Sequence, residues 1–468
     1  MDKQIFAFIE EQRGEYIKWL TDFCRIPSVA AQNRGMKEST DFIEDLFDKA
    51  LQTKPELLPT RGYPVVYSHL KGTKPTTLSF YNHYDVQPED PIELWDTPPF
   101  EPTFKDGKIY ARGVADNKGN LIARVAAIHA IKQVTGGLPI DIKFIFEGEE
   151  EIGSIHLADF ADKHQDKIQS DGCVWEFGYR DADDRLQVSL GVKGMLYVEL
   201  FIKGANTDLH SAQASIIESP IWRLIWALNL LKDPNDRVLI PGFYDSITPI
   251  TEEEQELLSH YLLEEKSTLD HLGIEKFVNG LTGEELKAKH IYEPTCNICG
   301  IQSGYTGEGS KTVLPSEAFA KIDFRLVPGQ NPHQLLEDLR TYLNTHGYDD
   351  IGIRVFGSEE AARTHPSEKL AQAVIETIGT YCDLPPNVIP NTPGTGPMFD
   401  LCQRFGIPSV SFGVGHFASY THAPNENIRV DDFIENIKLM AALVFKFEEK
   451  MNENGADLSE PVTNATTV

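Results

Sequence analysis

The sequence predicts an α/β protein with a doubly wound sheet, and three observations lead to this class. Residues 76–150 alternate between strand, helix and strand patterns, which is the order of a parallel βαβ unit. Several of the predicted strands end in histidine or acidic residues. Open α/β sheets carry their sites at such strand ends. With 468 residues, the chain is also too long for one compact domain of usual size, so two domains are expected.

Composition restricts the partners of the protein. The formal net charge of -28 disfavours nucleic acid and anionic membranes and favours attraction of cations. No apolar run reaches the roughly 18 residues of a membrane span, and the N-terminal segment lacks the apolar core of a signal peptide. We therefore expect a cytoplasmic protein that binds small molecules or metal. Its six scattered cysteines would be ordinary thiols in that reducing compartment.

The first predicted elements are helices and a strand pair. Residues 3–24 have the apolar spacing of one amphipathic helix. A second helix over residues 42–47 follows three polar residues, 39–41, that are suited to capping it. Residues 64–70 and 76–81 have strand character and are separated by a short polar segment, which indicates a hairpin-like pair.

The second strand of this pair is followed by His83 and Asp85. A histidine that binds metal needs an acceptor for its other ring nitrogen, and a carboxylate two residues further along an extended chain can provide it. A structural histidine with satisfied hydrogen bonds is the alternative. Residues 110–120 then form a glycine-rich turn into the helix at 121–128, and this turn places Asp116 where a strand gives way to a helix.

An acidic run follows the next predicted strand, residues 141–146. Glu147, Glu149, Glu150 and Glu151 lie close together there, and like charges persist in a fold only beside a cation or with one group protonated. A solvated acidic loop is the alternative. A further apolar strand, 173–175, ends in another acid, Glu176. One more histidine would complete two metal sites, and His416 and His422 near the C-terminus are the two candidates.

These motifs together resemble the M20 family of di-zinc exopeptidases and amidohydrolases. The matches run in order over nearly the whole chain: HxD at His83 and Asp85, DxKG at Asp116 to Gly119, EExGS at Glu150 to Ser154, the later acid at Glu176, and a histidine followed by xxNE at His422. The resemblance implies a zinc-exopeptidase-like αβα sandwich with an inserted α+β, ferredoxin-like lid. Residues 1–192 and 365–468 would form the catalytic domain, and residues 193–364 would form the lid and dimerisation domain.

The resemblance also implies a ligand set. One metal would be held by His83, Glu176 and bridging Asp116, and the other by Glu151, His422 and the same Asp116. Such oxygen and imidazole ligands suit Zn²⁺, with Mn²⁺ or Co²⁺ as alternatives. Glu150 would be the general base that takes a proton from water lying between the two ions and passes it to the leaving amine.

The same resemblance assigns roles to the remaining residues of the site. Asp85 would orient His83, Glu147 and Glu149 would be supporting acids, and His416 would be structural. In the lid, His210 would contact the oxyanion, and Asn297 and Arg325 would hold a substrate carboxylate, for which the two-pronged guanidinium is suited. Without the family, Arg325 would be interpreted as a surface strand residue. Gly394 resembles part of the glycine turn that lines the pocket floor.

Three further stretches have weaker signals. Cys296 and Cys299 form a lone CxxC, which we interpret as two strand residues on opposite faces of a sheet. Residues 251–290 are a charged helical insertion, and the polar tail 452–468 is predicted to be disordered.

The signals for substrate conflict. Glutamate at position 176 resembles carboxypeptidase-like and aminoacylase-like members, whereas Arg325-Leu326-Val327-Pro328 and the long lid resemble dipeptidases. We expect a metallopeptidase that cleaves an amide bond next to a free carboxylate, as a dipeptidase or short-peptide exopeptidase and a homodimer through its lid. N-acyl amino acids are the alternative substrates. A silent binding module is disfavoured, because Glu150 and every ligand are present.

Overall fold

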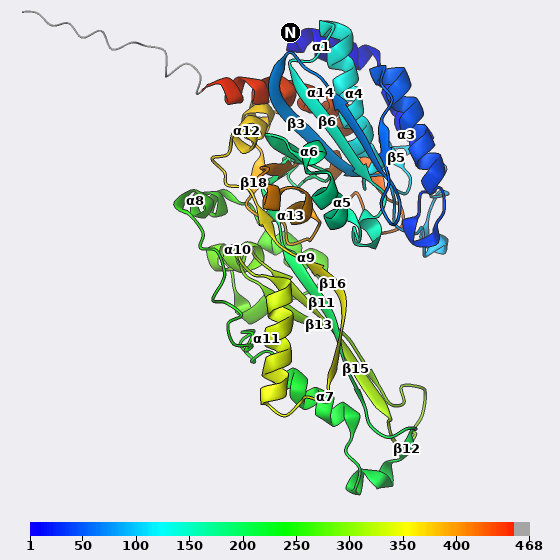
Figure 1. Cartoon of the computed structure of the whole chain (residues 1–468), viewed down its shortest axis with the longest axis vertical. Coiled ribbons are helices and arrows are strands. Elements are labelled where there is room, and N and C mark those ends of the chain that lie inside the picture. Colours follow the sequence, from blue (N-terminus) through cyan, green and yellow to red (C-terminus); the bar gives the residue numbers. More distant parts are fainter. Residues whose placement is uncertain (454–468) are drawn as a thin grey trace, which may run out of the picture. The chain divides into compact units, whose positions relative to one another are not determined.

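The computed structural model describes residues 1–453, which fold into two compact units (Figure 1). The first comprises Met1–Leu190, Thr364–Ile389 and the residues from Asp400 onward, and the second comprises Gly191–Arg363 and Pro390–Phe399. We had expected residues 390–399 in the catalytic part. They pack instead with the second unit, because Thr392 N donates to Gly191 O and Lys193 N donates to Gly394 O, both at 2.9 Å. All but the first two residues of the tail expected to be disordered, 452–468, lie outside the described residues.

The first unit is built on a mixed sheet. Within the described residues this sheet has eight strands, in the order β1 (Glu56–Leu58), β2 (Val65–Leu70), β6 (Ile140–Glu147), β3 (Lys74–His83), β7 (Gly172–Trp175), β19 (Ser409–Ser411), β9 (Gln187–Ser189) and β18 (Asn387–Ile389). Strand β3 is parallel to both β6 and β7, and β7 is parallel to β19. The α/β class is therefore confirmed, with an antiparallel edge at β1 and β2.

The expected hairpin of β2 and β3 is wrong. Both strands pair with β6, which lies between them. The physical reason is burial: all eight residues of β6 are buried, as expected for a central strand covered on both faces. Strand β3 can lie parallel to β6 because helix α4 (Lys118–Thr135) makes the long connection between them.

Helices cover this sheet, and α4 is the most buried of them (Figure 1). The others are α1 (Asp2–Glu11), α2 (Arg13–Cys24), α3 (Met36–Leu51), α5 (Leu157–Lys163), α6 (Gln165–Ile168), α12 (Lys369–Tyr381) and α14 (Val430–Asn452). The short helix α13 (Met398–Leu401) begins in the second unit and ends in the first. The single helix expected over residues 3–24 is broken at Gln12. The helix expected at 42–47 begins at Met36, after Gly35 in a left-handed conformation, so Ser39 and Thr40 lie inside it and do not cap it.

Short strands complete the first unit. Strands β4 (Thr103–Lys105), β5 (Lys108–Tyr110) and β21 (Asn427–Arg429) form one small sheet, and β8 (Tyr179–Arg180) pairs with β20 (Gly415–His416). The pairing of β5 with β21 brings residues near Asp116 beside residues near His422.

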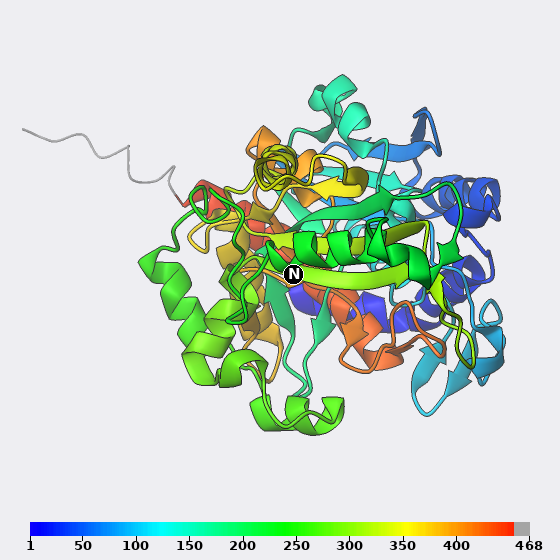
Figure 2. The ribbon, with the colours of Figure 1, turned by 90° about the horizontal axis from the view of Figure 1, so that it is seen from below.

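The second unit contains an antiparallel sheet in the order β13 (Thr295–Ser303), β15 (Glu317–Leu326), β11 (Gly194–Lys203) and β16 (Gly352–Glu359). Strand β15 alternates buried and partly exposed residues, the pattern of a sheet with one covered face. Helices α7 (Pro220–Asn229) and α11 (Pro332–Thr345) supply the core on that face. Figure 2 shows α7 running along the strands.

The remaining elements of the second unit are short. The charged insertion forms α8 (Glu252–His260), α9 (Glu265–Leu272) and α10 (Gly283–Tyr292). Strands β10 (Gly191–Val192) and β17 (Ala362–Arg363) pair with each other, as do β12 (Leu209–His210) and β14 (Val313–Leu314). Cys296 is buried in the core and Cys299 is exposed, so the CxxC residues lie on opposite faces as expected.

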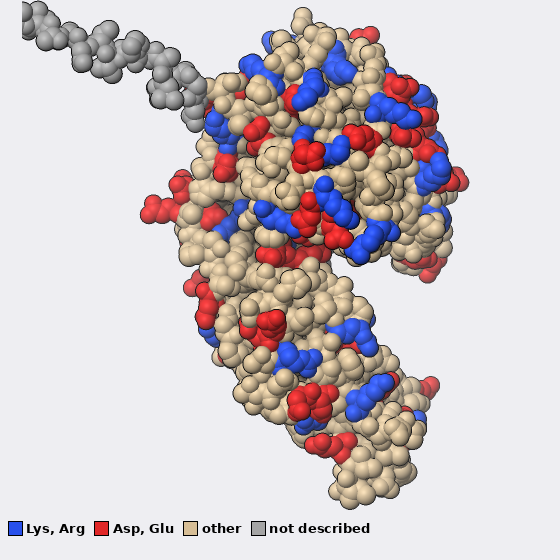
Figure 3. All heavy atoms as spheres, in the orientation of Figure 1, with Lys and Arg blue, Asp and Glu red and all other residues tan. Residues whose placement is uncertain are grey.

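The surface carries both signs of charge. Over the face shown in Figure 3, acidic and basic side chains of the first unit are interspersed and form no continuous basic patch. Among the described helices, none is both long enough and apolar enough to cross a membrane.

Leu339 tests the core of the second unit. It is fully buried on α11, so Leu339→Ala should lower the free energy of unfolding of this unit by about 2–5 kcal/mol through lost burial and a cavity. Glu337→Ala, on the exposed face of the same helix, should change it by less than about 0.5 kcal/mol. Urea unfolding monitored by circular dichroism measures both. Equal effects would contradict this description of the core.

Candidate metal centre

The candidate centre lies at the carboxyl edge of the parallel strands of the first unit. Strand β3 ends at His83, and Glu176 directly follows β7. Strand β6 leads into a short 3₁₀ turn that contains Glu150 and Glu151. These strands are adjacent and parallel, so their ends meet at one edge. Asp116 reaches the same place from the turn before α4.

Asp116 lies between two histidines. Its Oδ1 is 3.0 Å from His83 Nε2, and its Oδ2 is 3.1 Å from His422 Nε2. Each imidazole also faces a glutamate: His83 Nε2 is 3.4 Å from Glu176 Oε2, and His422 Nε2 is 3.2 Å from Glu151 Oε2. The structure thus brings together the five predicted ligands as two groups that share Asp116. Glu150 Oε2 lies at the margin, 4.0 Å from His83 Nε2.

Burial gives these groups unusual pKa values. Burial raises the pKa of Glu150 well above its usual range, and it raises that of Glu176 to about 8. For His83, burial opposes the charged form, yet Glu176 and Asp116 raise its pKa well above the ordinary value. Hydrogen bonds to Asp116 and Glu151 raise the pKa of His422 to about 10. The buried carboxylates therefore demand positive charge nearby.

Two buried carboxylate oxygens without hydrogen-bond partners are suited to binding a cation. Glu151 Oε1 and Glu176 Oε2 are buried and have no hydrogen-bond partner among the described residues. One of these oxygens lies in each group around Asp116. Ligand atoms of His83, Asp116 and Glu151 also lie within 4.8 Å of one another. Such unpaired buried oxygens are costly unless a metal ion takes them as ligands.

Asp85 faces His83 with both its backbone carbonyl and its carboxylate. His83 Nδ1 is 3.0 Å from the backbone oxygen of Asp85 and 3.4 Å from its Oδ1. The other carboxylate oxygen accepts a hydrogen bond of 3.0 Å from Glu151 N. The carbonyl is therefore the nearer acceptor for His83, and the carboxylate also fixes the turn that carries Glu151.

Each of the supporting acids has polar partners of its own. Glu147 accepts hydrogen bonds from Tyr81 and Ser154, and Glu149 lies 2.8 Å from His156 Nδ1. Gln87 Nε2 donates to Glu151 Oε2 at 2.8 Å. Sequence reasoning missed Gln87, although its place two residues after Asp85 was a usable signal.

His416 is separate from the predicted ligands in its bonding. It is buried, with Nε2 2.9 Å from Asn427 Oδ1, and Nδ1 accepts from Ala418 N at 3.2 Å. Both ring nitrogens are thus used within the loop. This bonding supports a structural role.

The other predicted site residues belong to the second unit. Arg325 Nε donates to Asp323 Oδ2 at 2.9 Å, and its Nη1 donates to Thr395 Oγ1 at 2.7 Å. Thr395 directly follows Gly394, so the glycine turn lies beside Arg325. Asn297 is exposed and is paired across the strands with Asp323. The structure therefore brings three of the predicted residues to one region. Sequence reasoning missed Asp323 and the contact between Arg325 and Thr395, which is part of the predicted glycine turn.

His210 lies elsewhere in the second unit. It is exposed at the end of β12, where its Nδ1 accepts from Ala212 N at 3.2 Å and its Nε2 is 3.4 Å from Thr312 Oγ1. No other predicted site residue contacts it within the described part of that unit.

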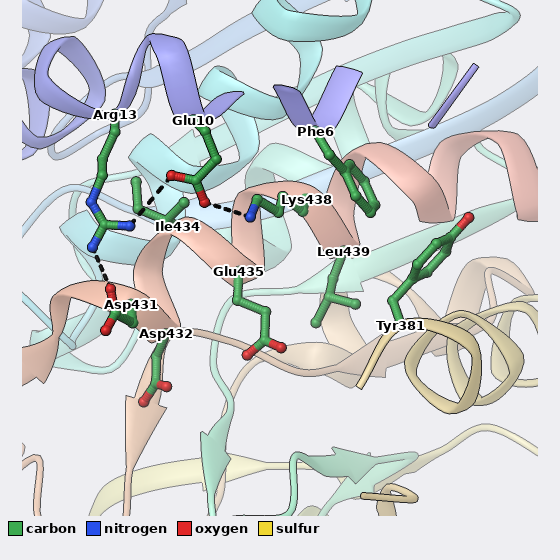
Figure 4. A pocket seen from close by; sticks show the side chains of 10 residues that line it. All are labelled: Phe6, Glu10, Arg13, Tyr381, Asp431, Asp432, Ile434, Glu435, Lys438 and Leu439. Atoms are coloured by element: carbon green, nitrogen blue, oxygen red, sulfur yellow. Dashed lines mark hydrogen bonds and ion pairs between the residues drawn. The ribbon is translucent and has the colours of Figure 1, made fainter. Parts of the chain in front are cut away.

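A groove on the first unit contains none of the predicted residues. It has a volume of about 420 Å³ and lies among α1, α2, α12 and α14 (Figure 4). Lys438 donates to Glu10 at 2.6 Å and Arg13 pairs with Asp431 within the groove. Asp432 and Glu435 pair instead with Arg180, which does not line it. The charged side chains that line the groove therefore each have an ion-pair partner.

Comparison with known proteins agrees with this geometry. The chain belongs to peptidase family M20/M25/M40, whose model matches residues 79–446. It is thus a hydrolase of a metal-dependent family, and the resemblance seen in the sequence is confirmed.

Three relatives show the extent of the similarity. A "Beta-Ala-His dipeptidase" from Homo sapiens is 29% identical, over 96% of this chain and 93% of the relative. The crystal structure of an M20 family metallo-carboxypeptidase, Sso-CP2 from Sulfolobus solfataricus, matches with 39% identity and a TM-score of 0.89, covering 92% of this chain and 99% of that one. The di-peptidase Dug1p from Saccharomyces cerevisiae shares the fold, with 21% identity, a TM-score of 0.81 and 96% and 99% coverage.

Proposed function

We propose that this protein is a two-metal exopeptidase that hydrolyses the amide bond next to a free carboxylate, with dipeptides or other short peptides as substrates. The observation that carries the proposal is that the two carboxylate oxygens of Asp116 contact two different imidazoles, and each imidazole also faces its own glutamate. The names of the human and archaeal relatives, a dipeptidase and a metallo-carboxypeptidase, support peptide substrates.

The ligand set supports two divalent ions, with Zn²⁺ the best fit. His83, Glu176 and Asp116 would hold one ion, and Glu151, His422 and Asp116 the other. All are nitrogen or oxygen donors without thiolate, which also allows Mn²⁺ or Co²⁺. When bound, such ions lower the pKa of water and polarise the carbonyl of an amide.

Glu150 is the proton carrier in this proposal. It lies beside the ligand groups but has no close partner of its own in them, since its carboxylate is 4.0 Å from His83 Nε2. Burial raises its pKa, which favours the protonated form that donates to a leaving group. Glu150 would take the proton of the attacking water and pass it to the leaving amine.

Arg325 would hold the carboxylate of the substrate. Asp323 and Thr395 fix its Nε and Nη1, which leaves Nη2 without a hydrogen-bond partner among the described residues. A guanidinium oriented in advance loses little entropy when it binds a carboxylate. Asn297 and the turn at Gly394 lie near enough in this unit to contribute.

His210 would donate to the oxygen that gains negative charge during the reaction. Since it belongs to a different unit from the ligands, its donation requires lid closure or a partner's lid. A homodimer through the second unit is supported by Trp222 and Trp226 on α7. They are about half exposed and stack at 5.8 Å, an apolar surface suited to a protein contact.

N-acyl amino acids are the second candidate substrates. They present the same carboxylate to Arg325, and glutamate at position 176 favoured them in the sequence. Assay of the zinc-loaded protein with dipeptides, N-acyl amino acids and C-terminally amidated peptides separates the two classes. Cleavage of amidated peptides as fast as free ones would refute the proposed specificity.

Glu150 and Glu151 test the assignment of base and ligand. Glu150→Gln should abolish turnover yet retain about two metal ions per chain, because the ligands remain. Glu151→Gln should also lose metal, because a carboxylate ligand is replaced by a weaker amide. Metal analysis by mass spectrometry measures both, with Glu149→Gln as the matched control. A metal-replete, inactive Glu149→Gln would show that the assignment is wrong by one residue.

Arg325 tests recognition of the carboxylate. Arg325→Ala removes a charge-assisted contact of roughly 1.5–3 kcal/mol, so kcat/KM for free peptides should fall by about 10- to 100-fold. Amidated peptides, which lack the carboxylate, should be nearly unaffected. Steady-state kinetics on matched free and amidated peptides decide the matter. Equal losses on both would contradict the proposed contact.

His210 tests donation from the lid. Loss of one oxyanion donor typically costs about 100- to 1000-fold in kcat, so His210→Ala should be nearly inactive with its metal content unchanged. Mixed dimers of His210→Ala and Glu150→Gln chains should regain one complete site if the histidine acts across the interface. No activity from heterodimers shown to form would place His210 in its own chain's site.

A further inference from the structure

Glu426 is a buried acid that binds the turn carrying Asp116. Its Oε1 accepts from Ala115 N at 2.9 Å and from Asp116 N at 3.0 Å. Its Oε2 accepts from Arg112 Nη1 and Gly113 N, both at 2.8 Å. The residue has no exposed surface. A single carboxylate thus receives four hydrogen bonds from one short turn that is more than three hundred residues away in sequence.

The backbone around Glu426 joins the same two segments. Ala111 N donates to Glu426 O at 3.1 Å, and Asn427 pairs with Tyr110 between β21 and β5. Glu426 follows His422 by four residues, and His422 has a φ of 60°, in the left-handed region. Non-glycine residues persist there only where their surroundings hold them. Glu426 supplies such an anchor at the end of this loop.

The bonding of Glu426 distinguishes it from the ligands. Both of its oxygens are fully used by donors, whereas Glu151 and Glu176 each keep one buried oxygen without a partner. A buried carboxylate is tolerated when donors saturate it, and charge-assisted bonds of this kind are about twice as strong as neutral ones. Glu426 can therefore hold the backbone of Asp116 firmly without binding metal itself.

We propose that Glu426 is a positioning residue that holds the loop of His422 against the turn of Asp116, so that both metal sites keep their geometry. The inference rests on the proposed two-metal function. Glu426 lies 310 residues from Asp116 in the chain, and His422 lies 306 residues from it. The contact between Glu426 and the turn of Asp116 holds these two segments together. Without it, the bridging aspartate and the second histidine would be free to separate.

Zinc affinity of the apoprotein tests this role directly. In Glu426→Gln, one oxygen becomes an amide NH₂ that faces N–H donors, so the turn should shift. The dissociation constant for zinc should rise by about 10- to 100-fold, the usual effect of losing a group that orients ligands. Competition titration against a chelator measures it, at a temperature where circular dichroism shows each variant folded.

Arg112→Met is the matched control. It removes one of the four donors from the same buried cluster, along with the contact of Arg112 over the Trp95 ring, but leaves the three backbone amides on Glu426. It should lower the melting temperature yet keep zinc affinity within a few-fold of the wild type. Excess zinc should restore more of kcat in Glu426→Gln than in Glu150→Gln, because only the former lacks metal.

The outcomes separate the hypotheses. Unchanged zinc affinity in folded Glu426→Gln, or an equal loss in Arg112→Met, overturns the positioning role. If Glu426→Gln does not fold, Glu426→Asp is titrated instead: it keeps the charge but is one methylene too short to reach all four donors, and it should also bind zinc weakly. If neither folds while Arg112→Met does and binds two ions, Glu426 serves the fold alone and the inference is wrong. Failure of the wild type to bind two ions would refute the proposed function instead.

Discussion

The crowding of carboxylates at one buried sheet edge is the constraint on which the rest of the structure depends. Asp116, Glu150, Glu151 and Glu176 converge there with the imidazoles of His83 and His422. Like charges in a medium of low dielectric constant repel strongly unless a cation compensates them. Burial first, and then the neighbouring carboxylates, raise the pKa values of Glu150 and Glu176 in the chain by itself. Two divalent ions at Asp116 would relieve it, which links the electrostatics to the chemistry of the family.

The topology of the sheet makes this convergence possible. Parallel strands β3, β6 and β7 end at the same edge, so residues from distant parts of the chain meet without long loops. The second unit is inserted into the chain of the first unit without disrupting its sheet. The insertion begins after β9, and the chain later forms β18, which pairs with β9. The two ends of the insertion are adjacent, because Thr364 N donates to Leu190 O at 2.7 Å. Insertion between neighbouring positions therefore costs the first unit little.

The second unit has one covered and one open sheet face. Alternate residues of β15 pack under α7 and α11, and Asp323 and Arg325 fall on the other face. A face that keeps charged residues is suited to binding a polar group. The fixed guanidinium of Arg325 is the feature that points to a carboxylate.

The sequence by itself determined the α/β class. It also predicted the five candidate ligands that the structure brings together, because spaced motifs such as His83-x-Asp85 place particular side chains at the ends of strands. It could not determine which strands pair or which unit a segment joins, because both depend on contacts between residues far apart in the chain. Strand β6 inserts between β2 and β3, and residues 390–399 join the second unit, since pairing is decided by burial and hydrogen bonding over the whole sheet. Glu426 shows the same limit. It is part of the sequence motif that contains His422, but the four groups that donate to it belong to residues 112–116. Only the tertiary structure brings those amides to a buried carboxylate, because a hydrogen bond requires proximity in space, which sequence spacing does not encode.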